Sequence, residues 1–276
     1  MMTTPAPKLD QGLVRIQGLL IDLDGVVTIG GKLLSGAGAA LARLHERIPY
    51  RFITNTTRRP RRRVVADLAA LGLAVDVGHL YTPAALVRAY CAERALSPFL
   101  ITHPDLAEDF DGLPTGGREA VIVGDAGEFF TYAQMNAAFR RLMHGADFLA
   151  LAANRAFQDG DGDLSLDAGP FVAALEFASR RKATVFGKPA RAFFDAAVTG
   201  LGLPPGAVAM IGDDVEADVG GAMAAGLAGV LVRTGKYRAG HETALAMPPT
   251  LVADDLTAAV DAILASFRAS GDRSAS

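Results

Sequence analysis

The sequence has few cysteines, no long apolar run and no apolar stretch among its first residues. One cysteine, Cys91, occurs among 276 residues, so an internal disulfide is excluded, and its neighbours predict an ordinary helix position. No run of about 18 uncharged apolar residues occurs, and the first residues lack an apolar stretch, so neither a membrane span nor a signal peptide is predicted. We therefore expect a cytoplasmic protein with no membrane partner.

An excess of charge of one sign is also missing. The chain has 30 acidic and 27 basic residues, a formal net charge of −3, which gives no strong attraction to nucleic acid. A small molecule is the expected partner. Half of the residues are apolar, enough for one large core or for a core with a second, smaller domain.

Short apolar runs alternate with longer amphipathic segments, a pattern typical of βαβ units and a largely parallel sheet. Strands are predicted at 19–22, 50–55, 207–213 and 228–235. The middle third repeats the pattern, with strands predicted at 99–103, 120–124 and 147–154. We expect an α/β fold with a doubly wound, mainly parallel sheet core in residues 1–83 and 184–276, and an inserted smaller α/β domain in residues 84–183.

Two aspartates, Asp22 and Asp24, follow the first predicted strand and precede a glycine turn. In open α/β sheets, ligands bind at the carboxyl ends of strands. Two carboxylates this close repel each other unless a cation lies between them, and Mg²⁺ suits them because it accepts carboxylates and bridges to phosphate. A structural turn is the alternative interpretation.

Hydroxyl and amide side chains follow the second predicted strand. Thr54 and Asn55 lie where backbone N–H groups and a hydroxyl would bind phosphoryl oxygens. Thr56 or Thr57 would alternatively cap a helix. Five arginines surround Pro60 and more simply form a solvated helix start, but Arg58, nearest Thr54, is a candidate substrate contact.

Two further sites follow later predicted strands. Lys188, in a Gly-Lys-Pro sequence, is a compact positive charge suited to phosphoryl transfer, although most lysines are ordinary surface groups. Asp213, Asp214 and Asp218 begin a helical segment. One of these carboxylates would contact the metal while another holds the lysine, although acidic residues in a first helical turn also complement the helix dipole.

The ordered set of DLDGV at Asp22, TNTT at Thr54, GKP at Lys188 and GDDxxxD at Asp213 resembles the haloacid dehalogenase superfamily of aspartate-dependent phosphatases. The insert between the second and third motifs is similar to the α/β cap of the group that contains nucleotide and pyridoxal phosphate phosphatases. This resemblance implies a Rossmann-like catalytic core and a cap domain, and it covers residues from about 15 to about 268.

The resemblance also implies a role for each motif residue. Asp22 would be the nucleophile and, with Asp24 and Asp213, would bind Mg²⁺. Asp24 would act as general acid and base. Lys188, Thr54 and Asn55 would bind the phosphoryl group. Lys188 would also be a catalytic residue, because it would neutralise phosphoryl charge. Asp214 and Asp218 would support the metal ligands and the lysine.

The implied activity is magnesium-dependent hydrolysis of a small phosphate monoester, pyrophosphate or phosphoamidate through an aspartyl-phosphate. A phosphotransferase or mutase, or a catalytically silent regulatory module, are the alternatives. In the related enzymes the cap faces the catalytic cleft, so Asn154 and Asp167 are expected substrate contacts. Because related capped enzymes often pair through the cap sheet, a homodimer is expected.

Overall fold

A computed structural model describes residues 1–276 except 1–12, 14, 46, 159–162 and 274–276. The chain divides into two compact units. The first contains residues up to Ile53, Leu71–Leu73 and Phe194 onward, and the second contains Thr54–Ala70 and Ala74–Phe193. Among the described residues, no helix has the length and apolar character needed to cross a bilayer.

The first unit is built on parallel strands in the order β14-β13-β12-β1-β4. These strands are β1 (Gly18–Asp22), β4 (Tyr50–Ile53), β12 (Val208–Gly212), β13 (Ala228–Val232) and β14 (Leu251–Ala253). A separate antiparallel hairpin is formed by β2 (Thr28–Ile29) and β3 (Lys32–Leu33). Every residue of β1 and β12 is buried, because neighbours cover both faces, as expected for parallel strands.

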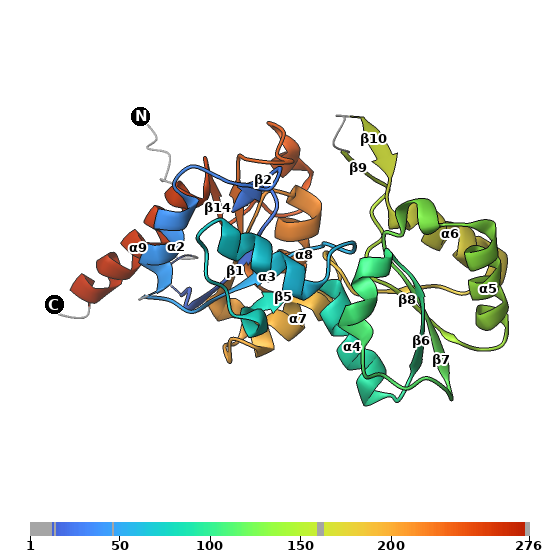
Figure 1. Ribbon diagram of the computed structural model, residues 1–276. Coiled ribbons are helices and arrows are strands. Elements are labelled where there is room, and N and C mark those ends of the chain that lie inside the picture. The colour runs from blue at the N-terminus through green and yellow to red at the C-terminus, as the bar shows by residue number, and fades with distance from the viewer. Residues whose placement is uncertain (1–12, 14, 46, 159–162, 274–276) are drawn as a thin grey trace. The chain divides into compact units, whose positions relative to one another are not determined.

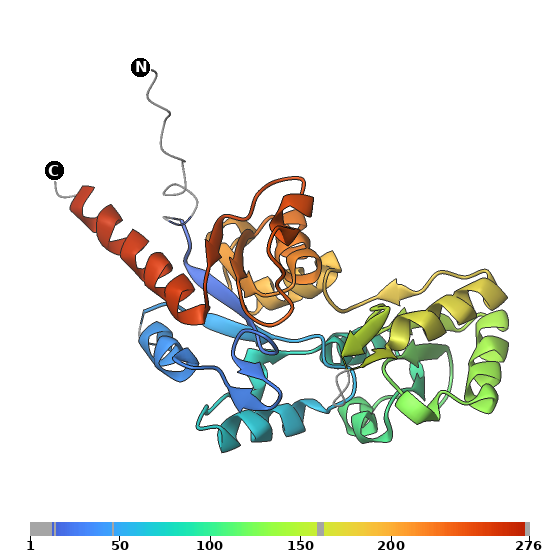
Figure 2. The same cartoon turned by 90° about the horizontal axis from the view of Figure 1, so that it is seen from above.

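Helices lie on both sides of this sheet. Helices α2 (Ala37–His45) and α9 (Leu256–Arg273) pack together on one side, and α8 (Gly221–Ala224) lies on the other, after a π-helical turn, η5 (Val215–Gly220) (Figure 2). The remaining elements are α7 (Arg191–Thr199), which spans the boundary of the units, and the 3₁₀ turns η4 (Pro205–Ala207) and η6 (His241–Ala244). The doubly wound core is thus confirmed.

The second unit has its own parallel sheet, in the order β11-β8-β7-β6 (Figure 1). The strands of this unit are β5 (Leu80–Tyr81), β6 (Ser97–Ile101), β7 (Glu119–Val123), β8 (Asp147–Ala150), β11 (Thr184–Val185), and the antiparallel hairpin β9 (Ala156–Gln158) and β10 (Leu164–Leu166). Its helices and turns are α3 (Arg61–Ala70), α4 (Pro83–Glu93), α5 (Tyr132–Met143), α6 (Ala168–Ser179), η1 (Val77–His79), η2 (Pro104–Phe110) and η3 (Gly127–Phe129).

Apolar cores cover both faces of this second sheet. On one face Val87 and Cys91 of α4 pack with Ile122 and Leu149 of the strands. On the other face, residues of α5 and α6 pack against Val121 and neighbouring strand residues. The inserted α/β domain is therefore confirmed as part of the fold class, whereas the boundaries at residues 83 and 184 stay a prediction.

Candidate active site

Three buried aspartates meet at the carboxyl end of the first sheet. Asp22 is the last residue of β1, Asp213 directly follows β12, and Asp218 lies in η5. A carboxylate oxygen of each lies within 4.8 Å of the others, and their residues are 6%, 1% and 1% exposed. Because β1 and β12 are adjacent and parallel, their carboxyl ends meet at one edge. We name this set the carboxylate group.

The carboxylate group fits a divalent cation. Three buried negative charges this close repel one another strongly in a medium of low dielectric constant, and a divalent ion would offset that repulsion. Hard oxygen donors of this kind suit Mg²⁺, which is usually bound by one or two carboxylates together with waters and substrate phosphate. Asp22, Asp213 and Asp218 are the residues that would contact such an ion or its waters.

Asp24 lies outside this set of three. Its residue is exposed, and its backbone forms an isolated bridge with Thr28 at the start of the β2–β3 hairpin. Asp24 is thus more accessible to solvent than the buried Asp22. This position is compatible with the acid and base role expected of Asp24, which stays a prediction.

Asp213 occupies a narrow space bounded by main chain. A Cβ atom added at Gly25 would lie 2.0 Å from Asp213 Oδ2, and one added at Gly235 would lie 1.9 Å from the same oxygen. Both glycines have positive φ, +94° and +53°, a conformation that other residues rarely adopt. The Lys236 N–H donates a hydrogen bond to Asp213 Oδ2 at 2.7 Å. Two glycines and one amide therefore hold this carboxylate in place.

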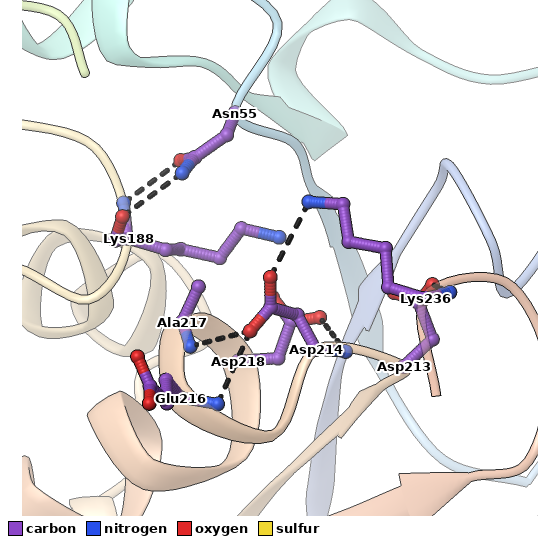
Figure 3. Close-up of polar contacts among 8 residues, drawn as sticks. All are labelled: Asn55, Lys188, Asp213, Asp214, Glu216, Ala217, Asp218 and Lys236. Carbon is purple, nitrogen blue, oxygen red and sulfur yellow. Dashed lines mark hydrogen bonds and ion pairs between the residues drawn. The ribbon is translucent and has the colours of Figure 1, made fainter. Parts of the chain in front are cut away.

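Asp214 accepts hydrogen bonds on both carboxylate oxygens. Its Oδ1 accepts from the N–H groups of Glu216, at 3.1 Å, and Ala217, at 2.9 Å, which caps the π-helical turn. Its Oδ2 lies 3.3 Å from Lys236 Nζ, and its own N–H donates to Asp218 Oδ2 at 3.1 Å (Figure 3). Asp214 is thus the N-cap of η5, and its main-chain N–H also orients Asp218.

The pKa values of this ion pair shift in the directions that stabilise both charges. Burial raises the pKa of Asp214, but the Ala217 N–H and the Lys236 ammonium outweigh it, so the pKa lies below its ordinary value. Burial lowers the pKa of Lys236, but Asp214, Asp218 and Asp213 outweigh it and raise the pKa above its ordinary value. Both groups are charged at neutral pH.

Lys236 is the residue that the sequence motifs did not identify. It lies in the segment Thr234–Gly235–Lys236, which follows β13, the neighbour of β12. The Thr234 hydroxyl donates to the carbonyl oxygen of Gly25. The rule that ligands gather at the carboxyl ends of parallel strands would have pointed to this segment.

A pocket of about 340 Å³ opens beside Lys236 in the first unit. Its lining residues are Asp214, Val215, Glu216, Lys236, His241 and Ala244. Two acids, Asp214 and Glu216, face one lysine in this lining, so the pocket has no surplus of positive charge for an anion.

The predicted phosphate-binding residues, Thr54, Asn55 and Lys188, lie in the second unit. Thr54 is buried, and its Oγ1 accepts a hydrogen bond from the Thr56 N–H at 3.2 Å. Asn55 and Lys188 bind each other through two hydrogen bonds, from Asn55 Nδ2 to the Lys188 carbonyl at 2.9 Å and from the Lys188 N–H to Asn55 Oδ1 at 2.8 Å (Figure 3). Lys188 is 4% exposed, so the surface-lysine interpretation is wrong.

Asp109 binds the start of α3, where Thr56 or Thr57 was the alternative expected as a helix cap. The Arg61 N–H that opens α3 donates to both oxygens of Asp109, at 3.2 and 3.1 Å. Thr57 instead accepts a hydrogen bond from the Asp125 N–H at 3.1 Å. Arg58 Nε lies 3.8 Å from Asp125 Oδ2.

Three further arginines of this cluster pair with acids at the surface. Arg59 and Arg63 contact Asp67, and Arg62 contacts Glu108. The solvated interpretation therefore describes these three. For Arg58, a substrate contact stays a prediction.

The two candidate substrate contacts of the cap lie at the start of α6. Asp167 is buried and caps α6, its Oδ1 accepting from the Ala168 N–H at 2.6 Å. The carbonyl oxygen of Asn154 accepts from the Gly169 N–H at 2.9 Å. These bonds give both residues structural roles, and their contact with substrate stays a prediction.

Comparison with known proteins agrees with this fold and identifies the family. Residues 19–114 match the haloacid dehalogenase-like hydrolase family model, and residues 185–259 match a HAD-hydrolase-like model. The phospholysine phosphohistidine inorganic pyrophosphate phosphatase of Danio rerio is 39% identical over 259 residues, covering 91% of this chain and 96% of the relative. The human haloacid dehalogenase-like hydrolase domain-containing protein 2 is 39% identical over 250 residues, covering 90% and 96%.

Solved structures share the fold. The 4-nitrophenylphosphatase of Thermotoga maritima matches with a TM-score of 0.83 at 24% identity, covering 92% of this chain and 99% of that one. The p-nitrophenyl phosphatase of Archaeoglobus fulgidus matches with a TM-score of 0.80 at 23% identity, covering 90% and 99%.

Fold and site together define a doubly wound α/β protein with buried aspartates gathered at the carboxyl ends of its parallel strands. The chain belongs to the haloacid dehalogenase-like hydrolase family, and it is a phosphatase of that family.

Proposed function

We propose that the protein hydrolyses a small phosphorylated compound with the help of Mg²⁺, through an aspartyl-phosphate formed on Asp22. The carboxylate group is the observation that supports this proposal most directly, because its three oxygens lie within 4.8 Å of one another. A divalent ion bound there would neutralise the phosphoryl oxygens and so make the phosphorus more electrophilic.

In the first step, a carboxylate oxygen of Asp22 attacks phosphorus, and the bond from phosphorus to the leaving group breaks. Asp24 protonates the leaving oxygen or nitrogen. Lys188, Thr54 and Asn55 are assigned to the phosphoryl oxygens, where a positive charge and hydrogen-bond donors stabilise the developing negative charge. This covalent route divides one difficult displacement into two easier ones.

In the second step, water attacks the phosphorus of the aspartyl-phosphate. Asp24, now ionised, accepts a proton from that water, so each turnover returns it to its starting state. The bond between Asp22 and phosphorus breaks, releasing inorganic phosphate and regenerating the carboxylate. Asp213, held by Gly25, Gly235 and the Lys236 N–H, keeps its orientation through both steps.

We propose substrates with a phosphate monoester, a pyrophosphate or a phosphorus–nitrogen bond. The curated relatives at 39% and 36% identity include phosphatases named for phospholysine, phosphohistidine and inorganic pyrophosphate, which supports the last two classes. A cytoplasmic location, a homodimer formed through the cap, and a cap spanning residues 84–183 belong to the same proposal.

The experiment compares the wild type with Asp22→Asn and Asp261→Asn in phosphate release from p-nitrophenyl phosphate, pyrophosphate and phosphohistidine with Mg²⁺. Asp261 is an exposed acid that pairs with Arg43, so its variant is the matched control. We expect Asp22→Asn to lower kcat by at least about a thousandfold and the control to match the wild type. Full turnover in Asp22→Asn would refute the assigned nucleophile.

A further inference from the structure

Lys236 contacts the metal-binding region through two separate parts of the residue. Its main-chain N–H binds Asp213 Oδ2 at 2.7 Å, whereas its side-chain ammonium lies 3.3 Å from Asp214 Oδ2 (Figure 3). The first contact depends on the path of the loop, and the second depends on the side chain. Substitution of the side chain therefore removes a charge while the main-chain bond to Asp213 stays in place.

The loop around Lys236 is held by contacts that do not involve this side chain. The Thr234 hydroxyl donates to the Gly25 carbonyl, and the Tyr237 N–H donates to the Thr234 carbonyl at 3.0 Å. Tyr237 also packs against an apolar cluster that contains Val219 and Leu231. Loss of the lysine side chain should thus leave the loop in position.

Asp214 likewise keeps its orientation without the lysine. Its Oδ1 accepts hydrogen bonds from the N–H groups of Glu216 and Ala217, and these bonds come from main chain. The ammonium contacts the other oxygen, Oδ2. The side chain of Lys236 thus contributes mainly charge to this site.

This charge opposes the binding of a metal ion. Four carboxylates, those of Asp22, Asp213, Asp214 and Asp218, lie in or beside the carboxylate group, and a positive charge next to them reduces their attraction for a divalent ion. The pocket beside Lys236 is also lined by the acids Asp214 and Glu216. The lining therefore has no net positive charge with which to hold an anion.

We propose that the positive charge of the Lys236 side chain, which pairs with Asp214, weakens the binding of the divalent cation and so keeps the ion exchangeable. This inference rests on the metal-dependent function proposed above. Lys236 contributes no ligand to the ion, since an ammonium has no acceptor.

The test is calorimetric titration of MgCl₂ into the purified full chain, without substrate, at constant ionic strength. We expect Lys236→Met to bind Mg²⁺ between about three and ten times more tightly than the wild type, a range set by solvent screening of an exposed side chain. Lys236→Arg, which retains the charge, should stay within about twofold of the wild type. Raising the salt concentration should reduce the difference in Mg²⁺ affinity between Lys236→Met and the wild type.

Lys182→Met is the matched control, because Lys182 is an exposed lysine of the second unit that pairs with Glu176. Its Mg²⁺ affinity should equal that of the wild type. Unchanged or weaker binding in Lys236→Met would overturn the inference, since a merely structural role predicts weaker binding. Absence of Mg²⁺ binding in the wild type would instead overturn the proposed metal site, and the inference with it.

Discussion

Asn55 and Lys188, 133 positions apart in the chain, are joined by two hydrogen bonds, from the side-chain amide of Asn55 to the main-chain carbonyl of Lys188 and from the main-chain N–H of Lys188 to that amide. Both residues come from motifs assigned to phosphate binding. Gly187, next to Lys188, has no room for a side chain, because an added Cβ would lie 2.8 Å from Asn55 Oδ1. The amide of Asn55 therefore sets the backbone position from which the Lys188 side chain extends.

Replacement of Asn55 by alanine should destabilise the protein by about 1–3 kcal/mol, because two hydrogen bonds are lost at a partly buried position. The free energy of unfolding from urea titration measures this effect. Gln134→Ala, at an exposed position of α5, is the control and should change the free energy by less than about 0.5 kcal/mol. Equal stability of both variants would contradict the role given to Asn55.

Gly235→Ala and Gly30→Ala should separate backbone strain from crowding at Asp213. The two glycines have φ values of +53° and +56°, so alanine costs each about 1 kcal/mol or more in strain. An added Cβ at Gly235 would lie 1.9 Å from Asp213 Oδ2, whereas one at Gly30 has nothing within 4 Å. We expect Gly235→Ala to lose more stability and to bind Mg²⁺ at least about tenfold more weakly, because Asp213 must move.

Thermal unfolding and Mg²⁺ titration measure the two effects. Gly30→Ala should keep the Mg²⁺ affinity of the wild type. If both variants lost affinity equally, backbone strain alone would explain the result, and the close approach to Asp213 would not matter.

Asp109 should make the stability of the protein depend on pH. Burial raises the pKa of its carboxyl above the ordinary value, and the Arg61 N–H only partly offsets this. The folded state therefore binds this proton more tightly than the unfolded state, and the resulting stability is present below about pH 3.9 and lost as pH rises through the raised pKa. We expect the free energy of unfolding of Asp109→Asn, relative to the wild type, to increase between pH 4 and pH 7.

Glu176→Gln should show the opposite sign. The hydrogen bond from Lys182 lowers the pKa of Glu176, with a further contribution from the Ala183 N–H. Its stabilising effect is thus present above the ordinary glutamate pKa and is lost as pH falls through the lowered value. Denaturant titrations measure Asp109→Asn at pH 4 and pH 7 and Glu176→Gln at pH 3 and pH 7, because the pKa of Glu176 lies below its ordinary value. Matching trends for the two variants would contradict these assignments.

Cys91 should resist thiol reagents in the folded protein. Burial raises the pKa of its thiol to about 11, and the residue is fully buried in the core of the second unit. Because the thiolate is the reactive form, we expect no labelling by an aromatic disulfide reagent at pH 8, and one equivalent after unfolding in guanidinium. Rapid labelling of the folded protein would show that this core opens readily.

The strands and the order of the motifs could be predicted from the local sequence pattern. The apolar runs of β1 and β12 predicted buried strands, and the aspartates at their ends predicted a metal site, because ligands gather at the carboxyl ends of parallel strands. That Asp22 and Asp213 share this site was implied by the family resemblance, since local pattern does not give the order of strands in a sheet. Asp218 did not follow as their third partner, since its orientation depends on the π-helical turn of η5, where the spacing differs from that of an α-helix.

The amino-acid sequence by itself determined the alternation of strands and helices, the family and the identity of the acidic residues, because these depend on periodicity and residue type. Tertiary structure alone decided that Lys236 binds Asp213 through its main chain and Asp214 through its side chain, and that Asp109 caps a helix 48 positions away. Such contacts join segments that are distant in the chain. They depend on how loops pack, and no local pattern records that packing.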